Sequence, residues 1–174
     1  MLDTFKTHFN IIAAELEEAN GREYQLMIAY EELSELEQAF TKLFRYGISD
    51  EKYLENFKEE VTDVLLTCEY VARIKNSNYY INFDRIYTDN LVNYYLGRRE
   101  RKEYIKDFLL IIIDAKRTIM KLIDAEKNKY TNNITSVLAV IENLLEIIYD
   151  NRWFSFISID DIYRYRELKM ERYK

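Results

Sequence analysis

Apolar residues recur every three or four positions along most of this 174-residue chain, which is the spacing of helices that bury one face. The pattern predicts helices over about 4–18, 22–45 and 50–75, and again over about 99–127 and 133–150. A last helix is predicted from Ser158, because Asp160 and Asp161 supply the acidic first turn of a capped N-terminus. No strand-like alternation is sustained, so we expect an all-α fold built as an antiparallel helical bundle.

The second and third predicted helices each carry one apolar row. The first row is Leu26, Ala29, Leu33, Leu36, Phe40 and Leu43, and the second is Phe57, Val61, Val64, Cys68 and Val71. Cys68 is therefore interpreted as a small buried core residue rather than a nucleophile. Gly47 predicts the end of one helix and Asp50 the capped start of the next. A connection this short favours antiparallel packing of the two helices.

The length of the chain suits one domain over residues 1–174, with helical hairpins at 22–75 and 99–150. The absence of proline and the presence of only three glycines favour long helices joined by short turns. Shifting the sequence by 82 positions places Asp114 on Glu32 and Glu142 on Glu60. A degenerate repeat of the first hairpin would explain this match, and so would chance alignment of two helices with the same apolar spacing.

The charge distribution narrows the possible partners. The net charge of −6 argues against a nucleic-acid binder, which would present a basic surface. Residues 1–75 hold 16 acids and 8 Lys/Arg, a balance of −8, so the acid excess lies in the first half. The single cysteine, the absence of a signal-peptide pattern at the start, and the shortness of the longest apolar run (108–113) predict a cytoplasmic protein without membrane partners.

Two acidic motifs stand at the edges of the two apolar rows. Glu32 and Glu35 each precede a row residue on one helix, as Glu60 and Asp63 do on the other. Positions three apart share a helix face, so packing of the hairpin would bring four carboxylates together. Two carboxylates ~4 Å apart repel by roughly 4 kcal/mol at an effective dielectric of ~20, so a divalent cation or proton uptake must relieve the repulsion, and we expect a cation there. The alternative is that these are solvated surface acids, because the chain has 31 acids in all.

The available ligands restrict the metal. The chain has one histidine, His8, outside both motifs, and one cysteine, so it lacks the ligands of di-iron bundles and structural zinc sites. Oxygen ligands alone favour hard cations, with Mg²⁺ as the first choice and Mn²⁺ as the second. Phosphate groups of a substrate commonly complete the coordination of Mg²⁺. The chemistry expected from such a site is metal-assisted attack of water on a phosphate chain.

The residues of the two motifs resemble those of a known family. The segments 31–36 (EELSEL) and 59–66 (EEVTDVLL), with 24 residues between Glu35 and Glu60, are similar to the signature of the all-α nucleoside triphosphate pyrophosphohydrolases. That superfamily includes MazG-like proteins and the dimeric dUTPases. The resemblance covers about residues 22–75, less than half of the chain, and the second half matches no subfamily.

The resemblance implies a fold, a reaction and a set of residues. It implies an all-α hydrolase that cleaves a (deoxy)nucleoside triphosphate, such as dUTP, to the monophosphate and pyrophosphate. Its metal ligands would be Glu32, Glu35, Glu60 and Asp63, and Glu31 resembles the water-activating glutamate of some members. Candidate phosphate contacts are Lys42, Arg73, Lys75 and Asn76. Family members often build the site between subunits, which implies a homodimer or higher oligomer.

Two interpretations in which the protein is not an enzyme stay open at this point. One is a catalytically silent helical protein of the same fold that binds nucleotides or a protein partner. The other is a helical interaction module with no metal. The unmatched second half of the chain makes the first of these two alternatives credible.

Overall fold

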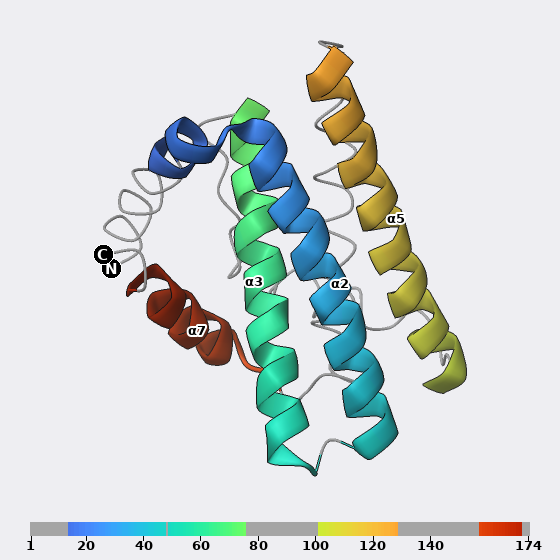
Figure 1. Cartoon of the computed structure of the whole chain (residues 1–174). Helices are drawn as coiled ribbons and strands as arrows, with labels where there is room; N and C mark the ends of the chain where they lie inside the picture. The colour runs from blue at the N-terminus through green and yellow to red at the C-terminus, as the bar shows by residue number, and fades with distance from the viewer. Residues whose placement is uncertain (1–13, 48, 76–100, 129–156, 172–174) are drawn as a thin grey trace, which may run out of the picture.

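The computed structural model describes residues 14–47, 49–75, 101–128 and 157–171 (Figure 1). They form the helices α2 (Arg22–Tyr46), α3 (Glu51–Lys75), α5 (Arg101–Asn128) and α7 (Ile159–Glu171), and residues 14–20 are also helical. No strand occurs within these ranges, so the all-α prediction is confirmed for them. Within the same ranges, no helix is both long and apolar enough to cross a lipid bilayer. The helix predicted over 133–150, and the part of the first one before residue 14, lie outside the described residues.

Glycine and aspartate set the ends of the first hairpin where the sequence predicts them. Gly21 (φ +79°) precedes α2 and Gly47 (φ +92°) follows it, both in backbone conformations that disfavour other residues. The Gly47 N–H donates to the Leu43 carbonyl at 2.8 Å, which closes the last turn. The Asp50 carboxylate accepts the backbone N–H of Lys52 at 3.2 Å and so caps the first turn of α3.

α2 and α3 run antiparallel and pack along their apolar rows (Figure 1). All six predicted row residues of α2 are buried, and Phe57, Val61 and Val64 of α3 are fully so. Leu65 joins the same buried face. The side chains of Cys68 and Val71 lie outside the described set. The two apolar rows together form a buried hydrophobic seam between α2 and α3. This seam determines how the two helices pack against each other.

α5 packs against α2 (Figure 1). Three rings from three helices meet where they approach: the Phe40 ring lies 4.4 Å from that of Phe108 and 5.9 Å from that of Phe57, centroid to centroid. All three side chains are buried. At the edge of this contact the Lys116 ammonium pairs with Glu37. The aromatic cluster therefore ties α5 to the hairpin.

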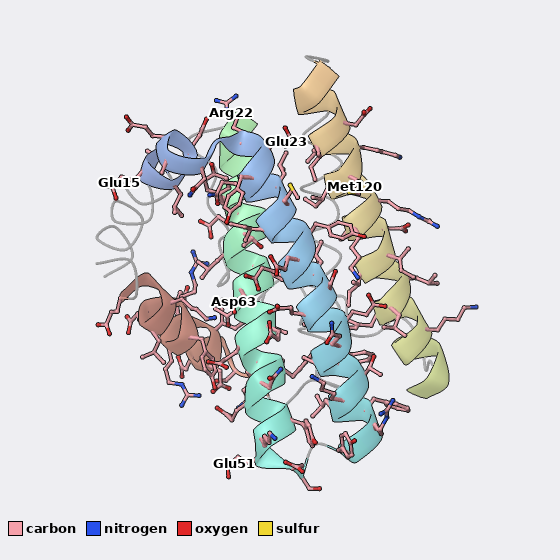
Figure 2. The ribbon with its side chains drawn as sticks, viewed as in Figure 1. Glu15, Arg22, Glu23, Glu51, Asp63 and Met120 are labelled. Carbon is pink, nitrogen blue, oxygen red and sulfur yellow. The ribbon has the colours of Figure 1, made fainter. Side chains whose placement is uncertain are left out.

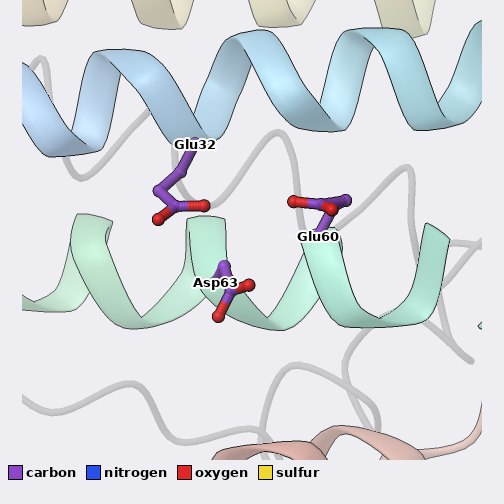
Figure 3. A group of neighbouring side chains, drawn as sticks. All are labelled: Glu32, Glu60 and Asp63. Atoms are coloured by element: carbon purple, nitrogen blue, oxygen red, sulfur yellow. The ribbon is translucent and has the colours of Figure 1, made fainter. Parts of the chain in front are cut away.

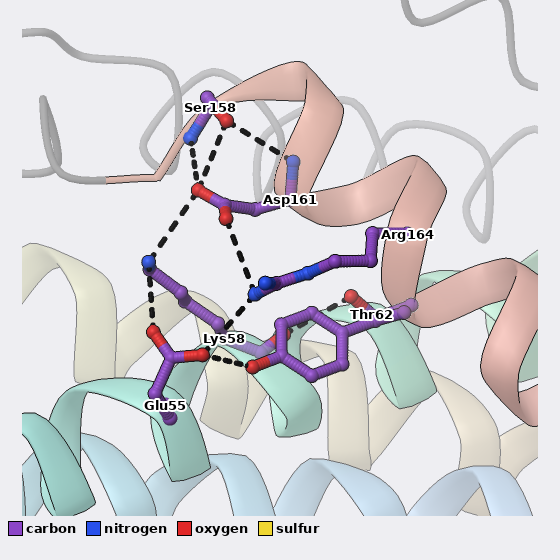
Figure 4. A network of polar contacts seen from close by, with 7 residues as sticks. Glu55, Lys58, Thr62, Ser158, Asp161 and Arg164 are labelled. Atoms are coloured by element: carbon purple, nitrogen blue, oxygen red, sulfur yellow. Dashed lines mark hydrogen bonds and ion pairs between the residues drawn. The ribbon is translucent and has the colours of Figure 1, made fainter.

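α7 docks on α3, and its N-terminus carries the predicted cap. The Ser158 hydroxyl accepts the Asp161 N–H at 3.0 Å, and the Asp161 carboxylate accepts the Ser158 N–H at 3.0 Å (Figure 4). This reciprocal pair is a capping box. Burial of Ile162 and Tyr165 supplies the apolar part of the α7 contact.

The aromatic cluster predicts a large effect of one core truncation. Phe57 is 0% exposed, and Phe57→Ala should lower the free energy of unfolding by about 3–5 kcal/mol, because it removes a ring and leaves a cavity. Urea denaturation of the full chain measures this difference. Tyr24→Ala, at a side chain 52% exposed, is the control and should cost only about 0.5 kcal/mol. Equal losses in the two variants would contradict the assigned core.

Candidate metal centre

Three of the predicted acids converge between α2 and α3. Glu32 of α2 and Glu60 and Asp63 of α3 each offer one carboxylate oxygen, and these atoms all lie within 4.8 Å of one another. Figure 3 shows the Glu32 carboxylate reaching towards α3 and the Glu60 carboxylate reaching towards α2. Asp63 lies one turn further along α3, on the side where α7 passes. We call this group the carboxylate cluster.

The cluster follows from the position of each acid beside the buried seam. Glu32 precedes Leu33, which is 0% exposed, and the two acids of α3 precede Val61 and Val64, which are also 0% exposed. One step along a helix turns a side chain by about 100°, so each acid stands at the rim of the seam and faces the other helix. The cluster lies near the middle of α3, as the place of Asp63 in Figure 2 shows. Fraying of the helix ends therefore does not reach it.

The fourth predicted ligand does not join the cluster. Glu35 is exposed and lies outside the group whose oxygens come within 4.8 Å. It remains close enough for its charge to raise the pKa of both Glu32 and Glu60. The reason is the rotation of side chains around the helix axis. Glu35 precedes Leu36, as predicted, but it lies three positions after Glu32. Over these three positions the helix turns the side chain of Glu35 further towards the solvent than that of Glu32. The structure thus brings together three of the four predicted acids.

The other predicted site residues are either exposed on α2 or have side chains that lie outside the described residues. Glu31, the candidate base, is exposed on α2 beside Glu32. Lys42 is also exposed on α2. Arg73 and Lys75 belong to the last turn of α3, but their side chains are outside the described set, and Asn76 lies outside the described residues altogether.

Burial and mutual repulsion hold protons on the cluster. The pKa of Glu32 is raised from 4.5 to about 7, first by burial and then by the charges of Asp63, Glu35 and Glu60. The pKa of Glu60 is likewise raised to about 7, by burial and then by the charges of Glu35 and Asp63. The uptake of protons by these two carboxyl groups near neutral pH is the result of burial first and of neighbouring negative charge second.

A lysine that sequence reasoning did not single out completes the group. Lys169, in the last turn of α7, donates a hydrogen bond to Asp63 Oδ2 at 2.5 Å. Its positive charge lowers the pKa of both Glu32 and Glu60, but burial and the neighbouring acids raise both pKa values by more. The sequence predicts this final helix but holds no signal for where the helix docks, because Lys169 and Asp63 are 106 residues apart.

Further polar contacts, among them that of Arg164 with Glu55, fix α7 on α3 away from the cluster. The Tyr165 hydroxyl donates to Glu55, and the Lys58 ammonium lies 3.5 Å from Asp161 and 3.0 Å from Glu55 (Figure 4). The Tyr165 hydrogen bond is the main reason why the pKa of Glu55 is lowered. These contacts hold the first turns of α7 against the first half of α3.

A charge pair buried deeper in the same interface was also missed by sequence reasoning. Arg166 of α7 donates to Glu69 of α3 at 2.6 Å, and both side chains are 0% exposed. The spacing of apolar residues cannot reveal such a pair, because Arg166 and Glu69 are charged residues at buried positions. Each charge is tolerated in the interior only because the other is present.

The carboxylate cluster suits a hard divalent cation. All three donors are carboxylate oxygens, and the described residues bring no histidine or thiol into the group. The Glu60 Oε2 atom is buried and has no hydrogen-bond partner within the described part of the chain. A buried acceptor of this kind is costly unless something satisfies it, and a cation with oxygen ligands would do so.

The raised pKa values predict an unusual pH dependence of the metal-free protein. A carboxyl group whose pKa rises from 4.5 when unfolded to about 7 when folded stabilises the fold while it is protonated. That stability is fully present below pH 4.5 and is lost as the pH rises through 7. With a chelator present, the free energy of unfolding should therefore be larger at pH 5.5 than at pH 8, as urea denaturation can measure.

The double variant Glu32→Gln/Glu60→Gln is the control for this measurement, because it removes both titrating groups and nearly keeps their shape. Its stability should change little over the same interval and should exceed that of the wild type at pH 8. A wild-type protein that gains stability as the pH rises from 5.5 to 8 would contradict the assigned repulsion.

Comparison with known proteins does not place this chain in a family. No model of a known protein family, no curated protein and no solved structure matches it. The chemistry of the chain's own residues, and above all the carboxylate cluster between α2 and α3, is therefore the basis for assigning a function.

Proposed function

We propose that this protein is a Mg²⁺-dependent nucleoside triphosphate pyrophosphohydrolase. It would cleave a (deoxy)nucleoside triphosphate, for example dUTP, to the monophosphate and pyrophosphate. The observation that carries the proposal is the convergence of Glu32, Glu60 and Asp63, with oxygen atoms within 4.8 Å, on two adjacent helices. The spacing of these acids resembles that of the all-α pyrophosphohydrolases, and the all-helical described part of the chain suits the antiparallel bundle of that family.

The donor set supports the choice of metal. Three carboxylates give a charge of −3 when ionised, more than the one charge of the Lys169 ammonium can balance by itself. Mg²⁺ prefers oxygen ligands and is held in proteins by a few carboxylates together with substrate phosphates, so a partial protein shell suits it. Mn²⁺ has similar preferences and is the second choice. Glu35 would contribute through its charge, or through a ligated water, rather than as part of the cluster itself.

The residues of the cluster suggest a division of labour. A divalent cation bound here would acidify water and neutralise charge on a phosphate chain. Glu31, exposed next to Glu32, would accept the proton of the attacking water. The new bond joins the water oxygen to the α-phosphorus, the bond from that phosphorus to the α,β-bridging oxygen breaks, and pyrophosphate leaves with the electron pair. Lys42, Arg73, Lys75 and Asn76 stay proposed contacts of the phosphate chain.

Oligomerisation belongs to the same proposal. Proteins of the resembled family often complete the site with a second subunit, so we propose a homodimer or higher oligomer. Two exposed apolar side chains of α5, Leu110 and Ile113, lie one turn apart and are compatible with a subunit contact.

A second candidate function is a catalytically silent protein of the same fold. The observation that favours it is the ion pair between Lys169 and Asp63, which already gives one acid of the cluster a positive partner. Such a protein would bind a nucleotide or a protein without turning it over. Metal-dependent thermal stabilisation without turnover would support this candidate. A helical module that binds no metal would show neither thermal stabilisation by metal nor turnover.

Release of pyrophosphate tests the leading proposal. The purified chain is incubated with each common deoxynucleoside and ribonucleoside triphosphate, with Mg²⁺ or with a chelator. We expect Mg²⁺-dependent formation of the monophosphate and pyrophosphate in equal amounts from at least one of them. Formation of inorganic phosphate and a diphosphate instead, or no turnover of any triphosphate, would refute the proposed reaction.

Glu60→Gln tests the site within the active protein. This variant removes one ligand charge and nearly keeps the shape, so turnover should fall ~100-fold or more while the helical fold stays intact. Glu59→Gln is the matched control, because it makes the same change at the preceding position of α3, outside the cluster. Full activity in Glu60→Gln, or equal losses in both variants, would show that the cluster does not carry the reaction.

A further inference from the structure

Lys169 places a positive charge on the carboxylate cluster from a helix distant in sequence. Its ammonium nitrogen lies 2.5 Å from Asp63 Oδ2, and the side chains of Lys169 and Asp63 are 23% and 12% exposed. An ion pair this short and this shielded from water is stronger than a typical surface pair. α7 therefore contributes an internal cation at the position where the proposed function needs a metal.

The docking of α7 does not depend on this ion pair. The buried pair of Arg166 with Glu69 and the hydrogen bond of Tyr165 to Glu55 hold the helix on α3. Both contacts involve acids outside the cluster. A lysine side chain has four rotatable bonds, so the ammonium of Lys169 can leave Asp63 while the helix stays docked.

The Lys169 ammonium alone does not neutralise the cluster. The three carboxylates of the cluster and the nearby Glu35 carry more charge than one lysine, and the Glu60 Oε2 atom is buried without a hydrogen-bond partner among the described residues. A divalent cation carries twice the charge and can take oxygen ligands from several acids at once. It would repel the ammonium as long as both remained at Asp63.

We infer that Lys169 is an internal counter-ion of the carboxylate cluster, and that a divalent cation binds by displacing its ammonium from Asp63. The inference rests on the metal site of the proposed function but not on turnover. It assigns a role to α7: the helix lowers the affinity of the cluster for metal and stabilises the cluster when metal is absent. Metal binding then exchanges an intramolecular ion pair for coordination and leaves α7 in place.

Titration with Mn²⁺ alone tests the inference in the full chain. Lys169→Met removes the charge and nearly keeps the length and volume of the side chain. Mn²⁺ should bind to this variant roughly tenfold more tightly than to the wild type, because it no longer has to break a charged hydrogen bond. Free Mn²⁺ is measured by electron paramagnetic resonance, and the affinity is checked by calorimetry.

Two further variants separate the ion pair from other effects. Lys121→Met changes the net charge equally at an exposed position of α5, which packs on α2 and not beside α7, and should leave Mn²⁺ affinity unchanged. Lys169→Arg keeps the charge and should bind Mn²⁺ much as the wild type does. If Lys169→Met does not fold, Lys169→Gln replaces it in the titration, with the same expected direction.

The stability of the metal-free protein supplies an independent readout. With a chelator present, Lys169→Met should unfold at lower urea than the wild type, because Asp63 loses its ion pair with Lys169. With saturating Mn²⁺ the order should be reversed or the difference lost. A variant whose stability is lowered equally with and without Mn²⁺ would instead show a merely structural lysine.

The outcomes distinguish this inference from the proposed function. Equal or weaker Mn²⁺ binding by Lys169→Met, beside a wild type that binds, would overturn the counter-ion role and leave the metal site standing. No Mn²⁺ binding by any variant would overturn both. Tighter binding by Lys169→Met in a protein that turns over no triphosphate would support the counter-ion role while it refutes the hydrolase.

Discussion

Repulsion between carboxylates that the hydrophobic seam holds together is the constraint on which the proposed chemistry depends. The buried rows of α2 and α3 set one register between the helices, and Glu32, Glu60 and Asp63 lie at the edge of those rows. The apolar contacts cannot be kept while the acids move apart, because a shift of the helices would unpack the seam. Part of the free energy of packing is thus offset by charge repulsion.

Three kinds of positive charge can relieve that repulsion. Protons do so near neutral pH, because burial and the neighbouring acids raise the pKa of Glu32 and of Glu60 to about 7. The Lys169 ammonium does so at Asp63, from a helix that the buried pair of Arg166 and Glu69 holds in place. A divalent cation would replace both and join the acids by direct coordination.

Much of the hairpin could be predicted from the sequence, because local rules determine it. Apolar spacing located α2 and α3 to within one residue at each end, and Gly47 and Asp50 act as the predicted stop and cap. The same spacing placed three acids together but could not resolve the rotation that leaves Glu35 exposed. Docking of α7 lay beyond prediction, because Lys169 and Arg166 find partners about 100 residues away, with no periodic pattern to link them.

Binding of a hard divalent cation by the carboxylate cluster is the step on which both proposals depend. A crystal structure of the full chain grown with Mn²⁺, with anomalous diffraction recorded near the manganese edge, tests it most directly. We expect one anomalous peak between Glu32, Glu60 and Asp63, at about 2.0–2.2 Å from their oxygen atoms, with the Lys169 ammonium no longer on Asp63. A cluster without a peak at saturating Mn²⁺, with Lys169 still paired to Asp63, would contradict it.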